Sequence, residues 1–265
     1  MRNRSLKLGL GVILACLAMA SGCEGPGSLE AQVDQAYQTS TITALLAGDY
    51  DGDLTCGELL THGDFGLGTF EGLDGEMIVL DGVVYRAKLD GTIEVVDASE
   101  ETPFAVVTFF EGKQFVSVSQ KPFGLDDLEE LLAPATFDPQ KPFAFRIEGK
   151  FDSLLTRSVP KQTEPYPPLT EAIKHQQERT HTNIEGTIVG FYFPQWAAGA
   201  NVAGYHFHFI SADKTVGGHV LAMDGKFLAV YVDACDSLLI EPLTNATTPP
   251  EVIHQLEVLK DIESR

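Results

Sequence analysis

The chain contains the segment Gly204-Tyr205-His206-Phe207-His208-Phe209 and, a short distance further on, Gly217-Gly218-His219. Three of its seven histidines therefore lie within one short stretch. The alternation of residue types around them, from 202 to 211, predicts a β-strand, in which successive side chains point to opposite faces. His206 and His208, two residues apart, are then expected on one face, and the phenylalanines between and after them on the core face.

A turn follows this strand. The polar run from Ser211 to Thr215 predicts the turn, and the residues from Gly218 to Met223 predict a returning strand. Positions 208 and 219 are equidistant from the centre of the turn, so His219 is expected opposite His208 on the same face, with Cβ atoms about 5 Å apart. Three converging neutral imidazoles suit zinc and leave a fourth position open, as catalytic sites require. Other divalent metals with a similar ligand preference are compatible with the same ligands.

The first 35 residues are typical of an export signal followed by a tether. Three basic residues precede the apolar run from Leu8 to Ala20, which is too short to span a membrane. The run ends in Ala20-Ser21-Gly22-Cys23, which resembles a bacterial lipobox, with ordinary signal-peptidase cleavage as the alternative. We predict a signal peptide over 1–22, a lipid anchor on Cys23 and a flexible tether over 23–35. The protein would then be an exported, membrane-anchored lipoprotein on a periplasmic or extracellular face.

The chain is strongly acidic, with a formal net charge of −20 at pH 7. The charged residues of the predicted signal are all basic, so its removal makes the net charge of the remaining chain more negative still. This charge argues against nucleic acid as a partner and against electrostatic adsorption to anionic lipid. An anionic substrate must therefore be attracted by local positive charge, such as a metal ion or a buried arginine.

Cysteine is scarce in this chain. Of four cysteines, Cys16 lies in the predicted signal and Cys23 at the predicted lipid site. Cys56 and Cys235 remain, and an exported protein is compatible with one disulfide between them or with two separate buried thiols.

Turn residues and apolar periodicity predict a mixed α+β fold. The expected strands lie over 65–96 (a β-meander), 104–110, 113–118, 143–155, 187–192, 202–211, 218–223 and 226–232, and the expected helices over 35–48, 125–132, 169–178 and 250–262. The proline-rich segment 160–168 suggests a domain junction. We therefore predict an N-terminal domain with a mixed β-sheet over 36–165. A smaller, barrel-like β domain over 166–265 would carry the metal site, the terminal helix and a tail.

The histidine segments occur together with other motifs in a fixed order along the chain. These are Tyr50-Asp51-Gly52-Asp53, Gly63-Asp64-Phe65-Gly66-Leu67-Gly68-Thr69-Phe70, Leu73-Asp74-Gly75-Glu76, Arg157-Ser158-Val159, Pro165-Tyr166-Pro167-Pro168, Gly186-Thr187-Ile188-Val189-Gly190-Phe191 and Lys260-Asp261-Ile262-Glu263. With these motifs the chain resembles the bacterial acetolactate decarboxylases from about residue 37 to 263.

The resemblance implies an enzyme, a carboxy-lyase of the acetoin and butanediol pathway that converts (S)-2-acetolactate into (R)-acetoin and carbon dioxide. It also implies a homodimer, in which the mixed sheet continues into that of the partner. By motif position, the implied zinc ligands are His206, His208 and His219. The other implied active-site residues are Thr69, Glu76, Arg157 and Glu263.

The implied chemistry gives each of these residues a role. Zinc bound by the ketone and hydroxyl oxygens would stabilise the enediolate that remains when carbon dioxide leaves. Arg157 suits a carboxylate because its planar guanidinium binds one bidentately; Arg86, Arg146 and Arg179 are the alternatives. Glu76 or Glu263 would deliver the proton to one face, and Thr69 could donate a hydrogen bond to a substrate oxygen.

Other functions also fit the histidines alone. The first is a cupin-like, iron-dependent oxygenase, although such enzymes commonly place a glutamate a few residues after the histidine pair, where this chain has Ala212 and Asp213. The second is a non-catalytic surface lipoprotein that binds a metal. A zinc-hydroxide hydrolase is compatible with the ligands but has no supporting motif.

Overall fold

The computed structural model of this chain describes residues 34–118, 123–125, 127 and 138–243. The predicted signal peptide and terminal helix, most of the predicted helix over 125–132, and Glu263 lie outside these residues. Within the described part, no helix combines the length and the apolar character needed to cross a bilayer.

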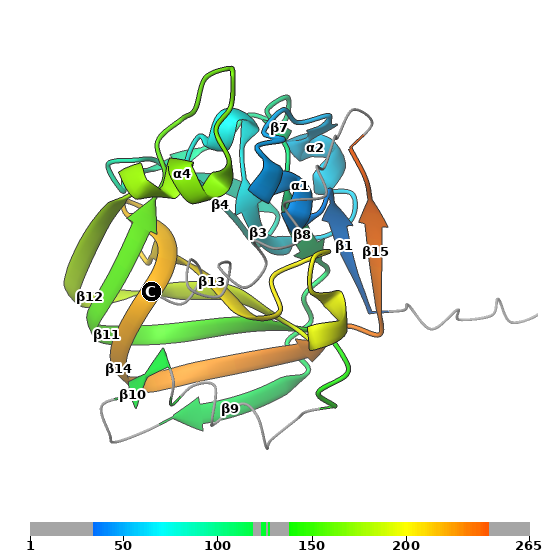
Figure 1. Ribbon diagram of the computed structural model, residues 1–265. Helices are drawn as coiled ribbons and strands as arrows, with labels where there is room; N and C mark the ends of the chain where they lie inside the picture. Colours follow the sequence, from blue (N-terminus) through cyan, green and yellow to red (C-terminus); the bar gives the residue numbers. More distant parts are fainter. Residues whose placement is uncertain (1–33, 119–122, 126, 128–137, 244–265) are drawn as a thin grey trace, which may run out of the picture. The chain divides into compact units, whose positions relative to one another are not determined.

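The first sheet has seven strands in the order β15-β1-β8-β3-β4-β5-β6 (Figure 1). Their bounds are β1 Gln35–Thr39, β3 Phe65–Thr69, β4 Glu76–Leu80, β5 Val83–Ala87, β6 Ile93–Val95, β8 Ala105–Thr108 and β15 Ser237–Glu241. β15 runs parallel to β1, whereas the other pairs are antiparallel, so the sheet is mixed, as predicted. The predicted meander is confirmed as β3 to β6.

The second sheet has six strands and contains the histidine hairpin. Its strands are β9 Gln114–Val118, β10 Phe123–Gly124, β11 Phe143–Ser158, β12 Gln177–Phe193, β13 Gly204–Ser211 and β14 Gly217–Ala234. β14 pairs with β11 and also with β13, so the pairings β14–β11–β12–β13 lead back to β14. His208 and His219 are therefore each paired with a strand on both sides, whereas His206 pairs with β12.

The helices of the described part are short, and the fold is mainly β. They are α1 Ile42–Ala47, α2 Cys56–Leu59 and α4 Leu169–Ala172, with 3-10 turns η1 Glu71–Leu73, η2 Ile173–His175 and η3 Gln195–Ala197; a small ladder joins β2 Leu54–Thr55 to β7 Glu101–Thr102. α1 begins after Thr41, whose hydroxyl accepts the Ala44 N–H, and ends at Gly48 with φ of 98°.

Several predicted elements differ from the structure. The helix expected over 35–48 is a strand followed by α1, because residues 35–39 pair with strands on both sides. The helix expected over 169–178 ends at His175, because residues from Gln177 onward pair with β11. The two strands expected over 218–223 and 226–232 form one strand, β14.

The sheets do not follow the order of the chain. β9, β10 and β11 precede the proline-rich segment but lie in the second sheet, and β15 follows it but lies in the first. The strand expected over 113–118 is β9, and it pairs with β14 of the second sheet. The two sheets are therefore not divided at residue 165, because each sheet contains strands that precede this residue and strands that follow it. The division into domains at that residue and the barrel-like description stay predictions.

The two sheets share a hydrophobic core. One cluster combines Ile78 and Val106 of the first sheet with Phe191 and Ile210 of the second, all fully buried. The phenylalanines at 207 and 209 belong to a separate cluster within the second sheet, on the side predicted for them. Packing of the two sheets brings β4 of the first against β13 of the second, which places the histidines of β13 at the junction of the two sheets.

Candidate metal centre and adjoining pocket

The three histidines converge, as the hairpin predicts. His208 pairs directly with His219 in the ladder between β13 and β14. His206 Nε2 lies 3.1 Å from His208 Nε2 and 3.2 Å from His219 Nδ1. These distances are close to the roughly 3.3–3.4 Å between ligand nitrogens of a tetrahedral zinc with bonds of about 2.0–2.1 Å. The residues could therefore hold a metal ion.

The turn between β13 and β14 has its own hydrogen bonds, which set this register. The Asp213 carboxylate accepts from the Ser211 hydroxyl at 2.7 Å and from the Thr215 hydroxyl at 2.8 Å. The Ser211 oxygen accepts the Val216 N–H at 3.1 Å. Such side-chain bonds to nearby backbone stabilise a turn, so the polar run predicted as a turn also explains why 208 faces 219.

A backbone carbonyl from the other sheet orients His208. Its Nδ1 lies 2.7 Å from the carbonyl oxygen of Met77 on β4. A carbonyl can only accept, so Nδ1 carries the proton and Nε2 presents its lone pair to the other two histidines. This is the arrangement that usually supports a metal-bound histidine. The donor set therefore fits a divalent metal with nitrogen ligands.

The surroundings keep His206 and His208 neutral. His206 is 8% exposed, and His208 and His219 are each 1% exposed. Burial and then the positive charge of Arg157 lower the pKa of His206 to about 3. Burial lowers the pKa of His208 well below its ordinary value, with His206 and Arg157 acting in the same direction and the Met77 carbonyl in the opposite one. Neutral imidazole is the form that binds metal.

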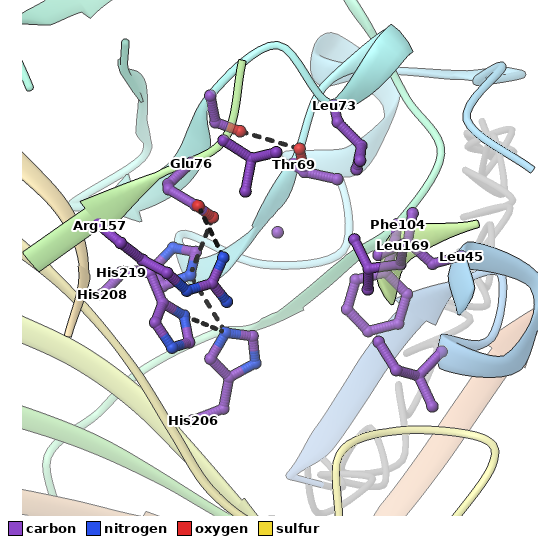
Figure 2. A pocket seen from close by; sticks show the side chains of 14 residues that line it. Leu45, Thr69, Leu73, Glu76, Phe104, Arg157, Leu169, His206, His208 and His219 are labelled. Carbon is purple, nitrogen blue, oxygen red and sulfur yellow. Dashed lines mark hydrogen bonds and ion pairs between the residues drawn. The ribbon is translucent and has the colours of Figure 1, made fainter. Parts of the chain in front are cut away.

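Two more predicted site residues lie beside the histidines (Figure 2). Glu76 begins β4, and Arg157 lies near the end of β11, directly opposite His219 in the ladder. Glu76 Oε1 is 3.6 Å from Arg157 Nη1, and Glu76 Oε2 is 3.6 Å from His208 Nε2. Both side chains are buried. Glu76 thus lies between the guanidinium and the histidine cluster.

Thr69 also lines the pocket, at the end of β3. Its hydroxyl donates to the Gly75 carbonyl at 2.8 Å and so closes the turn that leads into Glu76. In this arrangement the hydroxyl proton is engaged with the main chain rather than directed at a substrate oxygen.

The pocket has a polar and an apolar side. The polar side consists of Thr69, Glu76, Arg157 and the three histidines, and the apolar side of Ile42, Leu45, Leu73, Phe104, Val159 and Leu169. The cavity volume of the pocket is about 40 Å³. Sequence reasoning missed the apolar side, because its residues come from separate segments and share no local spacing.

The remaining candidates lie elsewhere. The three alternative arginines do not line the pocket: Arg86 pairs with Glu94 and Glu100, Arg146 with Asp81 and Glu148, and Arg179 donates to Gln177. Cys56 and Cys235 are free, buried thiols rather than a disulfide.

The chain is similar to known proteins of one family over most of its length. A model of the alpha-acetolactate decarboxylase family matches residues 36–247. The alpha-acetolactate decarboxylase of Methylococcus capsulatus is 44% identical over 207 residues, which cover 78% of this chain and 79% of that protein. That of Klebsiella aerogenes is 41% identical over 209 residues, covering 78% and 80%. The crystal structure of the enzyme from Bacillus subtilis strain 168 matches with a TM-score of 0.83 and 35% identity over 87% of this chain and 100% of that one.

Proposed function

The chain belongs to the alpha-acetolactate decarboxylase family, and we propose that it converts (S)-2-acetolactate into (R)-acetoin and carbon dioxide in the pocket described above. The observation that carries this proposal is the meeting of three buried imidazole nitrogens with Arg157 and Glu76 in one small pocket. The family match supports decarboxylation, and the geometry supports a metal-dependent form of it.

We propose that zinc is the metal, with His206 Nε2, His208 Nε2 and His219 Nδ1 as its ligands. Three imidazole nitrogens from paired strands match the ligand preference of zinc and would leave a coordination position for the substrate. When bound, a divalent metal ion acts as a Lewis acid toward the ketone and hydroxyl oxygens of the substrate, where negative charge develops.

Arg157 is proposed to bind the substrate carboxylate. Its guanidinium is 5% exposed and lies beside the histidines, so it offers a fixed positive charge in a chain that is otherwise strongly acidic. A planar guanidinium orients a carboxylate through paired hydrogen bonds. When the carboxylate is held in this way, the bond between C2 and the carboxylate carbon can break. Carbon dioxide leaves, and the electron pair of that bond passes toward the ketone oxygen, which gives an enediolate.

Glu76 is proposed to hold the proton that replaces carbon dioxide. Its carboxyl group lies between Arg157 and His208, so it adjoins both the proposed carboxylate-binding group and a proposed metal ligand. Protonation of C2 by a group fixed on one side yields a single enantiomer. The proposed (R) configuration rests on the resemblance to the family. Glu263 stays a prediction as a second acid, because it lies outside the described residues.

Three further expectations stay proposals. We propose that the protein is a homodimer, that residues 1–22 direct its export, and that Cys23 carries a lipid. The first rests on the resemblance to the family, and the other two on the residues of the N-terminal segment.

Turnover of racemic 2-acetolactate by the purified protein, measured under anaerobic conditions, tests the function. We expect acetoin and carbon dioxide in equal amounts, mainly the (R) enantiomer, and loss of activity on treatment with a chelator. His208→Ala should lose bound zinc and activity together. His175→Ala, at an exposed histidine outside the pocket, is the matched control and should keep both. Acetoin formation that requires oxygen, or that survives complete removal of metal, would contradict the proposal.

A further inference from the structure

The two sides of the pocket face each other. In Figure 2, Leu45, Phe104 and Leu169 lie across the pocket from Arg157 and His206. Leu45 comes from α1, Leu169 from the first residue of α4, and Phe104 from the segment just before β8. We call these three side chains the alkyl wall.

The alkyl wall is already packed. Leu45, Phe104 and Leu169 are 6%, 2% and 5% exposed. They belong to one core cluster, in which Tyr50 and Val202 are also buried. Closely packed side chains of this kind yield little to an incoming group, because an extra methylene in a filled core forces neighbours off their preferred rotamers.

The chemistry of the substrate determines which part of it meets this wall. A 2-alkyl-2-hydroxy-3-oxo acid carries its carboxylate, hydroxyl and ketone oxygens on adjacent carbons. A buried oxygen needs a polar partner. Among the described residues that line the pocket, Glu76, Arg157 and the histidines offer such partners, and they lie on one side of it. The alkyl group on C2 and the alkyl end of the acyl group must then face the apolar side.

The space in front of the wall is small. The cavity volume of the whole pocket is about 40 Å³, and a cavity needs roughly 10–15 Å³ of such volume to hold one water molecule. An n-propyl chain directed toward the apolar side would therefore overlap Leu45, Phe104 or Leu169.

We propose that the alkyl wall determines substrate specificity by limiting the length of the alkyl substituents. The substrate class is then 2-hydroxy-3-oxo acids with short alkyl groups, and the homologue with an n-propyl group on C2 is rejected. This inference rests on the proposed function of the same pocket. It assigns the choice between homologues to three residues that take no part in bond breaking.

The test compares two substrates, the 2-methyl and the 2-n-propyl homologues of 2-hydroxy-3-oxobutanoate, by release of carbon dioxide from the full-length, zinc-loaded protein. We expect the wild type to favour the methyl homologue in kcat/KM by at least about tenfold, the usual effect of extra methylenes at a tight apolar site. Leu45→Ala and Leu169→Ala should each raise the propyl-to-methyl ratio of kcat/KM by about tenfold.

Leu46→Ala is the matched control. Leu46 is the next residue of α1, is fully buried in the same cluster, and does not line the pocket. The control loses the same side chain but should leave the ratio within about twofold of wild type, since specificity responds to groups that meet the substrate. Leu45→Val, which removes less volume, provides the measurement if Leu45→Ala does not fold.

The outcomes separate the two proposals. Turnover of the methyl homologue with the same ratio in wild type, Leu45→Ala and Leu46→Ala would overturn the inference and leave the proposed function intact. An equal change of the ratio in all variants would overturn it too, because the effect would then follow destabilisation rather than position. Failure of the wild type to release carbon dioxide from either homologue would overturn the proposed function together with this inference.

Discussion

Gly218 offers a sharp test of how the site is held. Its φ is 149°, a value that favours glycine, and it directly precedes His219. A Cβ placed there would lie 2.6 Å from the Arg157 carbonyl oxygen and 3.2 Å from Thr156 Cβ. The neighbouring strands β11 and β14 therefore approach more closely than any side chain at this position would allow.

The cost of Gly218→Ala has two parts. An unfavourable backbone conformation costs about 1–3 kcal/mol, and the forced contact with a neighbouring backbone costs about 1–3 kcal/mol more. The free energy of unfolding should fall by about 2–6 kcal/mol, which lowers Tm by roughly 2–4 °C for each kcal/mol. Separation of the two strands also moves His219 away from Arg157. We expect kcat/KM to fall by about tenfold to a hundredfold, as small displacements of catalytic groups commonly do.

Gly82→Ala is the matched control. Gly82 also has a positive φ, 74°, but a Cβ there meets nothing within 4 Å. This variant should lose only about 1–2 kcal/mol and keep its activity and its content of bound metal. Urea unfolding, zinc analysis and carbon dioxide release, measured on both variants, give the comparison. A Gly218→Ala protein as stable and as active as Gly82→Ala would refute the reasoning.

Three further predictions concern other parts of the molecule. Burial raises the pKa of Cys56 to about 11 and that of Cys235 to about 12, so iodoacetamide at pH 8 should label neither in the native protein and both in denaturant, as peptide mapping by mass spectrometry would show. Asp233→Ala should lower the free energy of unfolding by about 2–3 kcal/mol with kcat unchanged, because its carboxylate accepts three successive backbone N–H groups at 111–113; urea titration measures this. Arg157→Lys should keep the fold but lower kcat/KM by at least about tenfold, because an ammonium group lacks the planar pair of donors; steady-state kinetics and circular dichroism test it.

The histidine site could be predicted because its determinants are local. The alternation of the strand predicts that His206 and His208 lie on one face. The polar residues locate the centre of the following turn, and that centre predicts that His219 lies opposite His208, as the structure shows. Both arguments depend only on neighbours in the sequence. The family resemblance added Glu76 and Arg157, and these lie beside the histidines although they come from other strands.

The parts that could not be predicted depend on contacts between distant segments. Residues 35–39 carry a helix-like apolar spacing, but two strands flank them and impose an extended conformation. The Met77 carbonyl has no signature in the sequence, because every residue has such a group. The alkyl wall draws Leu45, Phe104 and Leu169 from three segments, and apolar residues of this kind are common throughout any core.

The hydrogen bond between His208 and the Met77 carbonyl joins the two sheets through a main-chain atom. Exchange of the Met77 side chain leaves that atom in place, so chimeric proteins assembled from two relatives would keep the link whichever parent contributes this position. What such chimeras must preserve is the spacing between the sheets, which the interleaved side chains of the shared core set. Chimeras with a crossover point between β4 and β13 should therefore fold and stay active only when the core side chains of the two parents match in volume. This should hold even when every active-site residue is the same in both parents.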